Sequence, residues 1–241
     1  MRFLLTIIIT SCVFFVNAQE KKNIYLFPGQ GSDCRIFSKL EFDTNRFEVS
    51  CFDYGVPMKD ESLEDFALRI SKYIDTTREF VLIGVSLGGM LCTELAHQIN
   101  PSKTIIISSA KTMHELPKKY TLQRQVNLYK VIPANWYKKG ALFLQPIVEP
   151  DRRNEKSTFK AMLKKKSPLY FKRTVKMLVL WNRTSCTEEI IHIHGDKDHT
   201  IPLDNLKPSY IVKNGSHMMT LTRARDINKI IINTLTEDFS E

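Results

Sequence analysis

The segment Phe80–Met90 constrains the fold of this chain more than any other stretch of the sequence. An apolar run, residues 80–83, leads into a Gly-x-Ser-x-Gly motif, residues 84–88, which is followed by a helical pattern of apolar residues. This order predicts a strand, a sharp turn and a helix, with Ser86 at the apex of the turn. Glycines flank the serine because a Cβ at either position would crowd the turn. Ser86 is therefore a candidate nucleophile, and the N–H of Leu87, at the start of the helix, is a candidate donor to an oxyanion.

Short apolar segments alternate with amphipathic helical patterns along most of the sequence. This alternation predicts an α/β fold class: one domain, residues 19–241, with helices on both faces of a doubly wound, mostly parallel sheet. The chain has 241 residues, 43% of them hydrophobic. This length is enough to form one sizeable hydrophobic core and is barely enough for two domains. The expected strands are 23–27, 47–52, 80–84, 103–108, 190–194 and 210–212, and the expected helices around them are 33–40, 62–74, 87–99 and 218–235.

Residues 111–182 interrupt this alternation. They contain helical patterns near 119–130, 136–145 and 154–166. Because the span lies between two predicted strands, we interpret it as an insertion rather than a second domain. An insertion there lies above the carboxyl ends of the strands, where the sites of open α/β sheets form, so we expect a helical lid. We assign the breaks within it to Pro117, Pro133, Pro146, Pro150 and Pro168.

The positive charge of the chain is concentrated in this insertion. The whole sequence has a net charge of +9, but residues 111–176 hold 17 Lys and Arg against 4 Asp and Glu, which leaves a net of −4 for the rest. Most of these lysines are expected to form a solvated face. Two functional interpretations stay open: attraction of an anionic substrate, and contact with an anionic membrane surface.

The first 18 residues are predicted to be a cleaved secretory signal. Arg2 precedes the apolar run 3–16. Val16 and Ala18 are small residues at the −3 and −1 positions of a signal-peptidase site, so we place the cleavage after Ala18. A membrane anchor is one alternative, but the apolar run falls short of a full span. A lipid anchor at Cys12 is the other; the residues after Cys12 are apolar where a solvated tether is expected. Export by a cleaved signal, to a periplasmic or secreted location, is therefore the preferred interpretation.

Four cysteines lie outside this signal: Cys34, Cys51, Cys92 and Cys186. Four cysteines allow three complete pairings, and nothing in their spacing selects one. Cys51 and Cys92 lie in apolar, periodic segments, and we interpret both as small core residues.

Two motifs near the C-terminus supply the partners that a nucleophilic serine needs. The late predicted strand ends in His-Gly-Asp-Lys-Asp-His-Thr-Ile-Pro, residues 194–202, and Asn-Gly-Ser-His-Met follows at 214–218. With the serine motif before them, the chain resembles the α/β-hydrolase family, whose order is Ser, acid, His. The resemblance covers about residues 22–110 and 186–235.

The resemblance implies a catalytic role for each member of this set. Ser86 attacks, His217 is the general base, and Asp198 holds the histidine in its tautomer and stabilises the imidazolium. Asp196, two residues earlier, is the competing acid, but the spacing of the loop favours Asp198.

The family's second oxyanion donor comes from the loop after the first strand. Here that loop reads Pro28-Gly29-Gln30, so the resemblance implies the backbone N–H of Gln30 as the partner of the Leu87 N–H. Pro28 stands where the family often has histidine; this departure leaves the N–H of Gln30 available.

A metal site is the rival interpretation of the late strand. His192-x-His194-x-Asp196-Lys197 resembles the metal motif of the metallo-β-lactamase fold, and imidazole and carboxylate groups suit zinc. However, lysine replaces the last histidine, and a cation there opposes a metal. We therefore expect no metal or organic cofactor. His192 is interpreted as a hydrogen-bonded core residue, and His194 as a residue that shapes the acid loop.

These features together predict an exported serine hydrolase that cleaves a carboxylic ester or related acyl substrate. The expected partner is a small acyl compound, and the predicted signal disfavours nucleic acid. The alternatives are thioester hydrolysis, acyl transfer or carbon–carbon cleavage on the same triad, or a binding protein that keeps this fold without turnover. Nothing in the sequence indicates an oligomeric state.

Overall fold

The structure, a computed structural model, describes residues 20–149 and 155–236. The predicted signal segment, 1–18, and Cys12 lie outside the described residues. Among the residues that are described, no helix combines the length and apolarity that crossing a membrane requires.

Six parallel strands form one sheet within the described residues, in the order β2-β1-β3-β4-β5-β6. The chain runs outward from β1 to β2 on one side and to β3 on the other, so the strand order reverses next to β1. The prediction of a doubly wound, mostly parallel sheet is confirmed. The strands are β1 (Lys22–Phe27), β2 (Phe47–Cys51), β3 (Phe80–Val85), β4 (Lys103–Ile107), β5 (Ile190–Gly195) and β6 (Tyr210–Val212).

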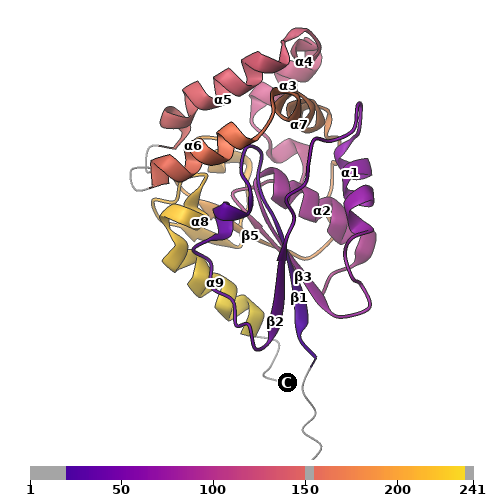
Figure 1. Ribbon diagram of the computed structural model, residues 1–241, viewed down its shortest axis with the longest axis vertical. Coiled ribbons are helices and arrows are strands. Elements are labelled where there is room, and N and C mark those ends of the chain that lie inside the picture. Colours follow the sequence, from indigo (N-terminus) through magenta and orange to yellow (C-terminus); the bar gives the residue numbers. More distant parts are fainter. Residues whose placement is uncertain (1–19, 150–154, 237–241) are drawn as a thin grey trace, which may run out of the picture.

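Both faces of the sheet are buried, as the alternation of side chains in β1 shows. Ile24 and Leu26 belong to one apolar cluster, whereas Tyr25 and Phe27 belong to the other. A parallel sheet needs this because crossover helices cover both of its faces. Figure 1 shows the helices α1 and α2 on one side and α8 and α9 on the other. Their bounds are α1 (Leu63–Ser71), α2 (Leu87–Ile99), α8 (Met219–Thr222) and α9 (Ala224–Thr236), and the short 3-10 helix η1 (Cys34–Phe37) packs on the face of α8 and α9.

The helices expected at 33–40 and 218–235 differ in extent from the observed ones. The first is only the single 3-10 turn η1, capped by the side chain of Asp33 and continued by i→i+3 bonds. The second is divided into α8 and α9 at Arg223.

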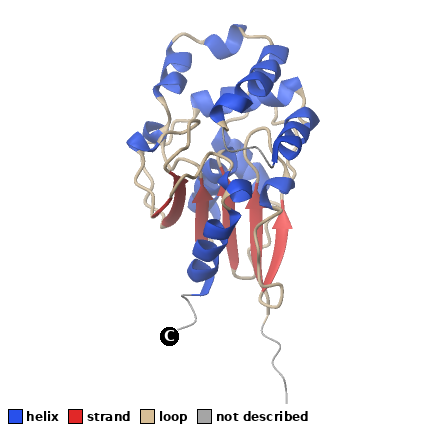
Figure 2. Cartoon of the chain, turned by 90° about the vertical axis from the view of Figure 1, so that its left-hand side faces the viewer, coloured by secondary structure: helices blue, strands red, loops and turns tan. Residues whose placement is uncertain are grey.

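Between β4 and β5 the described residues form a series of helices in the region where the sequence predicts an insertion, residues 111–182, and we keep the name insertion for it. Figure 2 shows helices gathered above the arrowheads of the strands, the carboxyl edge of the sheet. The helices are α3 (Lys118–Gln125), α4 (Leu128–Val131), α5 (Ala134–Val148), α6 (Lys156–Lys165) and α7 (Pro168–Leu180).

One of the predicted proline breaks is wrong, and the break at Pro168 is confirmed because α6 ends at Lys165. Pro146 lies inside α5, near its C-terminal end. Pro168 opens α7 as its first residue, and the Ser167 hydroxyl caps that helix by accepting the N–H of Tyr170. A proline is favoured at the first position of a helix because its missing N–H would have no helical partner there. The pair Ser167-Pro168 therefore starts a helix that the sequence prediction lacked.

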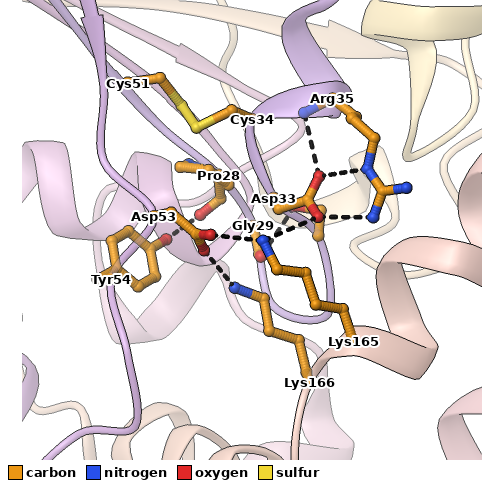
Figure 3. Close-up of a disulfide and its surroundings, with 11 residues drawn as sticks. Pro28, Gly29, Asp33, Cys34, Arg35, Cys51, Asp53, Tyr54, Lys165 and Lys166 are labelled. Atoms are coloured by element: carbon orange, nitrogen blue, oxygen red, sulfur yellow. Dashed lines mark hydrogen bonds and ion pairs between the residues drawn. A yellow bond between two sulfur atoms is a disulfide. The ribbon is translucent and has the colours of Figure 1, made fainter.

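The interpretation of Cys51 as a core residue is also wrong. Cys51 ends the edge strand β2, is half-buried, and forms a disulfide with Cys34 of η1 (Figure 3). Pairing brings the loop after β1 against the end of β2. Cys92 is buried and unpaired on α2, as predicted for a core cysteine.

Candidate active site

Ser86 occupies the turn between β3 and α2 in a backbone conformation that few residues adopt. Its φ is 54° and its ψ is −120°. A Cβ on Gly84 would lie 2.3 Å from the carbonyl oxygen of Gly88, and one on Gly88 would lie 1.9 Å from that of Phe27. Both glycines are therefore required by close backbone approach, and the turn holds the serine Oγ clear of the sheet.

A continuous chain of hydrogen bonds joins Ser86, His217 and Asp198. Nε2 of His217 lies 2.9 Å from Oγ of Ser86, and Nδ1 lies 2.7 Å from Oδ2 of Asp198. With its proton on Nδ1, the ring donates to the carboxylate and accepts from the hydroxyl. The other carboxylate oxygen, Oδ1, accepts the N–H groups of Thr200 and Ile201 at 2.8 and 2.9 Å. The acid is thus fixed on both oxygens.

The structure places Asp198, and not Asp196, at the histidine. Asp198 is buried, whereas Asp196 is exposed in the turn that follows β5. His194 also supports the acid loop, because its Nε2 lies 2.9 Å from the carbonyl oxygen of Ile201. His192 is buried beside it and contacts its Nδ1 at 3.1 Å, so it is the hydrogen-bonded core residue that was predicted.

The electrostatics of the three residues favour an ionised acid and a basic histidine. Burial works against the Asp198 carboxylate, but the charge and hydrogen bond of His217 hold the pKa of Asp198 below its usual value. Burial also disfavours the imidazolium of His217, yet the pKa of His217 is raised because Asp198, and further off Glu149, stabilise that charge. A histidine tuned in this way accepts a proton from a serine more readily.

The loop after β1 lies directly against the serine. A Cβ on Gly29 would stand 3.0 Å from Cβ of Ser86, and the next residue, Gln30, lines the cavity beside it. The side chain of Gln30 donates to Oγ1 of Thr174 on α7 at 2.7 Å. Within the described residues, no acceptor takes the backbone N–H of Gln30 or of Leu87. The two N–H groups that are expected to bind an oxyanion are thus available as hydrogen-bond donors.

A cavity of about 240 Å³ opens onto Ser86 between the sheet edge and the helical insertion. Gln30, Ser86 and His217 line it from the sheet side, and Gln145 and Glu149 of the α5 segment line it from the insertion. The sequence prediction did not include Glu149. The one feature of the sequence that could have drawn attention to Glu149 is that it is one of only 4 acidic residues in the basic stretch 111–176. The apolar walls include Met90, Leu163, Phe171 and Leu178.

The metal motif of the late strand does not form a site in the described residues, where no group of three or more His, Cys, Asp or Glu side chains could hold an ion. The ring nitrogens of His192 and His194 that face each other are in contact, and Asp196 points to solvent from the following turn. These three residues therefore do not converge.

No protein-family model and no curated protein matches the sequence of this chain. Among solved structures it is similar to an enol-lactonase from Burkholderia xenovorans LB400, with a TM-score of 0.71 and 14% identity over 90% of this chain and 92% of that one. It is also similar to MenH from S. aureus (TM-score 0.70, 15% identity, 92% and 96% covered) and to a thermophilic esterase from Thermogutta terrifontis (TM-score 0.67, 14% identity, 90% of each).

The sheet order, the strained serine turn and these structural neighbours define the class. The chain has the α/β-hydrolase fold.

Proposed function

We propose that this protein is a serine hydrolase that cleaves a carboxylic ester by way of an acyl-enzyme. The observation that carries the proposal is the hydrogen-bonded chain from Asp198 through His217 to Ser86, with the serine on a strained turn beside a cavity. A nucleophile, a base within reach of its proton and a residue that orients the base form the minimum set for acyl transfer.

The reaction follows from this geometry. As Oγ of Ser86 attacks the ester carbonyl, its proton passes to Nε2 of His217, and Asp198 stabilises the resulting imidazolium. The N–H groups of Gln30 and Leu87 hold the oxyanion of the tetrahedral intermediate. His217 then protonates the leaving alcohol. A water molecule, deprotonated by the same histidine, attacks the acyl-enzyme, releases the acid and restores the serine hydroxyl.

The names of the structural neighbours support an ester as the bond that is cleaved. They include an esterase, an enol-lactonase and a lipase–esterase related protein, so both open and cyclic esters are within the proposal. Thioester hydrolysis, acyl transfer and carbon–carbon cleavage use the same triad, and a binding protein would keep the fold without turnover.

A fluorophosphonate probe tests the nucleophile directly, because it labels activated serines. We expect wild type to be labelled at Ser86 and to hydrolyse p-nitrophenyl acetate, and the Ser86→Ala variant to do neither. Equal labelling of both proteins contradicts the assignment. Labelling at Ser86 without turnover of esters or thioesters would contradict ester hydrolysis and leave acyl transfer, carbon–carbon cleavage and the binding protein as alternatives.

We also propose that the protein is exported after cleavage behind Ala18. The disulfide between Cys34 and Cys51 supports this, since such bonds persist in oxidising compartments. Mass spectrometry of the protein recovered from the producing cell is the test. A chain starting at Gln19 is expected; a retained residue 1 or a lipidated Cys12 rules out the cleavage.

For the basic insertion we propose contact with an anionic membrane surface. Trp136 and Phe143, seven residues apart on α5, are 69% and 76% exposed, and the exposed Lys139 lies between them. An apolar stripe beside cations suits the interface of a membrane. We expect flotation with phosphatidylserine vesicles that is lost on adding salt and on Trp136→Ser/Phe143→Ser. Binding that salt does not change contradicts the electrostatic part.

A further inference from the structure

Among the groups that line the cavity beside Ser86 and that the proposed reaction does not use is the carboxyl of Glu149. Glu149 caps the end of α5 and is only 2% exposed. By distance and angle, neither of its carboxyl oxygens makes a hydrogen bond within the described part of the chain, although the Ser216 hydroxyl and the Met218 N–H lie close enough to act on its pKa. Buried polar groups are almost always paired, since leaving one unpaired is costly, so this carboxyl indicates a ligand that completes its bonding.

The surroundings of Glu149 make it an acceptor. Burial raises the pKa of Glu149 to about 7, against the opposing influence of His217 and of the nearby Ser216 hydroxyl and Met218 N–H. At neutral pH the carboxyl is therefore partly ionised, and in both forms it offers oxygen lone pairs to a donor.

The cations that the structure describes in the insertion do not line this cavity, although Lys119 acts on His217 from outside it. No lysine or arginine is among the described residues that line the cavity, although the insertion as a whole is strongly basic. A substrate that carries a carboxylate would meet Glu149 there and no lysine or arginine side chain among the residues described. The expectation that the basic residues attract an anionic substrate therefore does not extend to the cavity itself.

We propose that Glu149 forms a subsite that binds a hydroxyl or ammonium group of the substrate and disfavours substrates with a carboxylate at that position. This inference rests on the proposed ester hydrolysis, since it assigns the class of ester. It gives the cavity two parts: the bond to be cleaved lies at Ser86, and a donor group on the same molecule lies at Glu149.

Two matched series of esters test the subsite without assuming which side of the ester reaches it. The first consists of p-nitrophenyl benzoates with a 4-ethyl, 4-hydroxymethyl, 4-aminomethyl or 4-carboxy group. The second consists of phenyl acetates with the same four substituents. The substituents are similar in size and differ in hydrogen bonding and charge, so ratios of kcat/KM within a series report the subsite.

We expect the hydroxymethyl and aminomethyl esters of at least one series to exceed the ethyl ester by about tenfold or more in kcat/KM, with the carboxy ester slowest. In Glu149→Leu these ratios fall to about one, since no acceptor remains. Glu149→Gln keeps an acceptor but no charge, so it loses the preference for the aminomethyl ester and gains activity on the carboxy ester by about tenfold. Glu155→Gln is the matched control: Glu155 pairs with Lys39 away from the cavity, and its ratios stay those of wild type.

The outcomes separate this inference from the function on which it rests. If Ser86 is labelled and p-nitrophenyl acetate is hydrolysed, but no series shows a donor preference, the subsite is wrong and the hydrolase stands. A preference that persists in both Glu149 variants also overturns the subsite. If wild type is neither labelled nor active, both proposals fail. Circular dichroism establishes that each variant is folded, and Glu149→Gln carries the test if Glu149→Leu does not fold.

Discussion

The sheet edge and the helical insertion face each other across one cavity, but they hold their polar groups in different ways. On the sheet side, Ser86, His217 and Asp198 are linked by hydrogen bonds of 2.7 and 2.9 Å. On the insertion side, by distance and angle, Glu149 has no hydrogen bond to either carboxyl oxygen within the described residues. Groups that make and break bonds need a geometry fixed in advance, whereas a group that selects a ligand is completed only by that ligand.

The two regions also differ in how their chain segments are held in place. The sheet side is closed covalently, because the Cys34–Cys51 disulfide joins the segment after the Gln30 loop to β2. In the described residues the insertion is attached to it without a covalent cross-link, by buried apolar side chains of α7 that share one cluster with α1 and α2, and by ion pairs. In these pairs the Asp53 carboxylate accepts hydrogen bonds from Nζ of Lys165 at 2.7 Å and from Nζ of Lys166 at 3.0 Å (Figure 3). We therefore expect the largest effects of substitution on the sheet side.

Exchanging Asp198 for asparagine tests whether the sheet side fixes the chemistry. An amide in place of the carboxylate favours the wrong tautomer of His217, so Asp198→Asn should lower kcat for p-nitrophenyl acetate by about 10⁴-fold. The matched control is Asp196→Asn, two residues away and exposed, which should stay within about twofold of wild type. Equal losses in the two variants would break the assignment of the acid.

Substituting one glycine in each region by alanine compares how tightly the two regions are packed. Gly88→Ala would put a Cβ 1.9 Å from the carbonyl oxygen of Phe27, so we expect a loss of about 3 kcal/mol or more in the free energy of unfolding. Gly140 lies within α5 of the insertion, and a Cβ there meets nothing within 4 Å. Gly140→Ala should therefore stabilise by about 0.5–1 kcal/mol, since alanine favours a helix. Urea unfolding measures both; a tolerated Gly88→Ala would contradict the close approach at the serine turn.

Removing the disulfide tests the covalent closure of the sheet side. Cys34 and Cys51 are 17 residues apart, and a loop of this length predicts a loss of about 3 kcal/mol for Cys34→Ala/Cys51→Ala. Wild type unfolded with a reductant present should show the same loss, whereas the unpaired Cys186→Ala should stay near wild type. No change on reduction would mean that the disulfide does not stabilise the fold.

The sequence could predict those parts of the molecule whose structure is determined by residues close together in the chain. The run 80–88 predicts a strand, a turn and a helix because its apolar and glycine positions leave little choice. The spacing of the acid loop likewise favoured Asp198 over Asp196, and the structure places Asp198 at His217.

The remainder depended on contacts between distant segments. Four cysteines allow several pairings, and only the folded chain, in which β2 pairs with β1 and η1 follows β1, brings Cys34 to Cys51. Pro168 can end one helix or start another, and the hydroxyl of Ser167 decides for the start of α7. Glu149 looks like an ordinary surface residue in sequence. Its burial beside His217 arises from the way the insertion sits over the sheet.

The smallest effect we predict is a shift of the pH profile, and it couples the two regions. In the proposed reaction His217 acts as a base only when neutral, so we expect kcat/KM to fall as the pH drops through its pKa, which lies above the ordinary 6.5. Besides Asp198, two groups of the insertion face it: Glu149 stabilises the imidazolium and Lys119 destabilises it.

Replacing these two groups should move the acidic limb of that profile in opposite directions. Glu149→Gln removes a negative charge, lowers the pKa of His217 and moves the limb to lower pH. Lys119→Met removes a positive charge and moves the limb to higher pH. Profiles of kcat/KM for p-nitrophenyl acetate at constant ionic strength measure both shifts. If both variants shift in the same direction, or neither shifts, the insertion does not act on the histidine through its charges, and its part in the site is limited to enclosing the cavity.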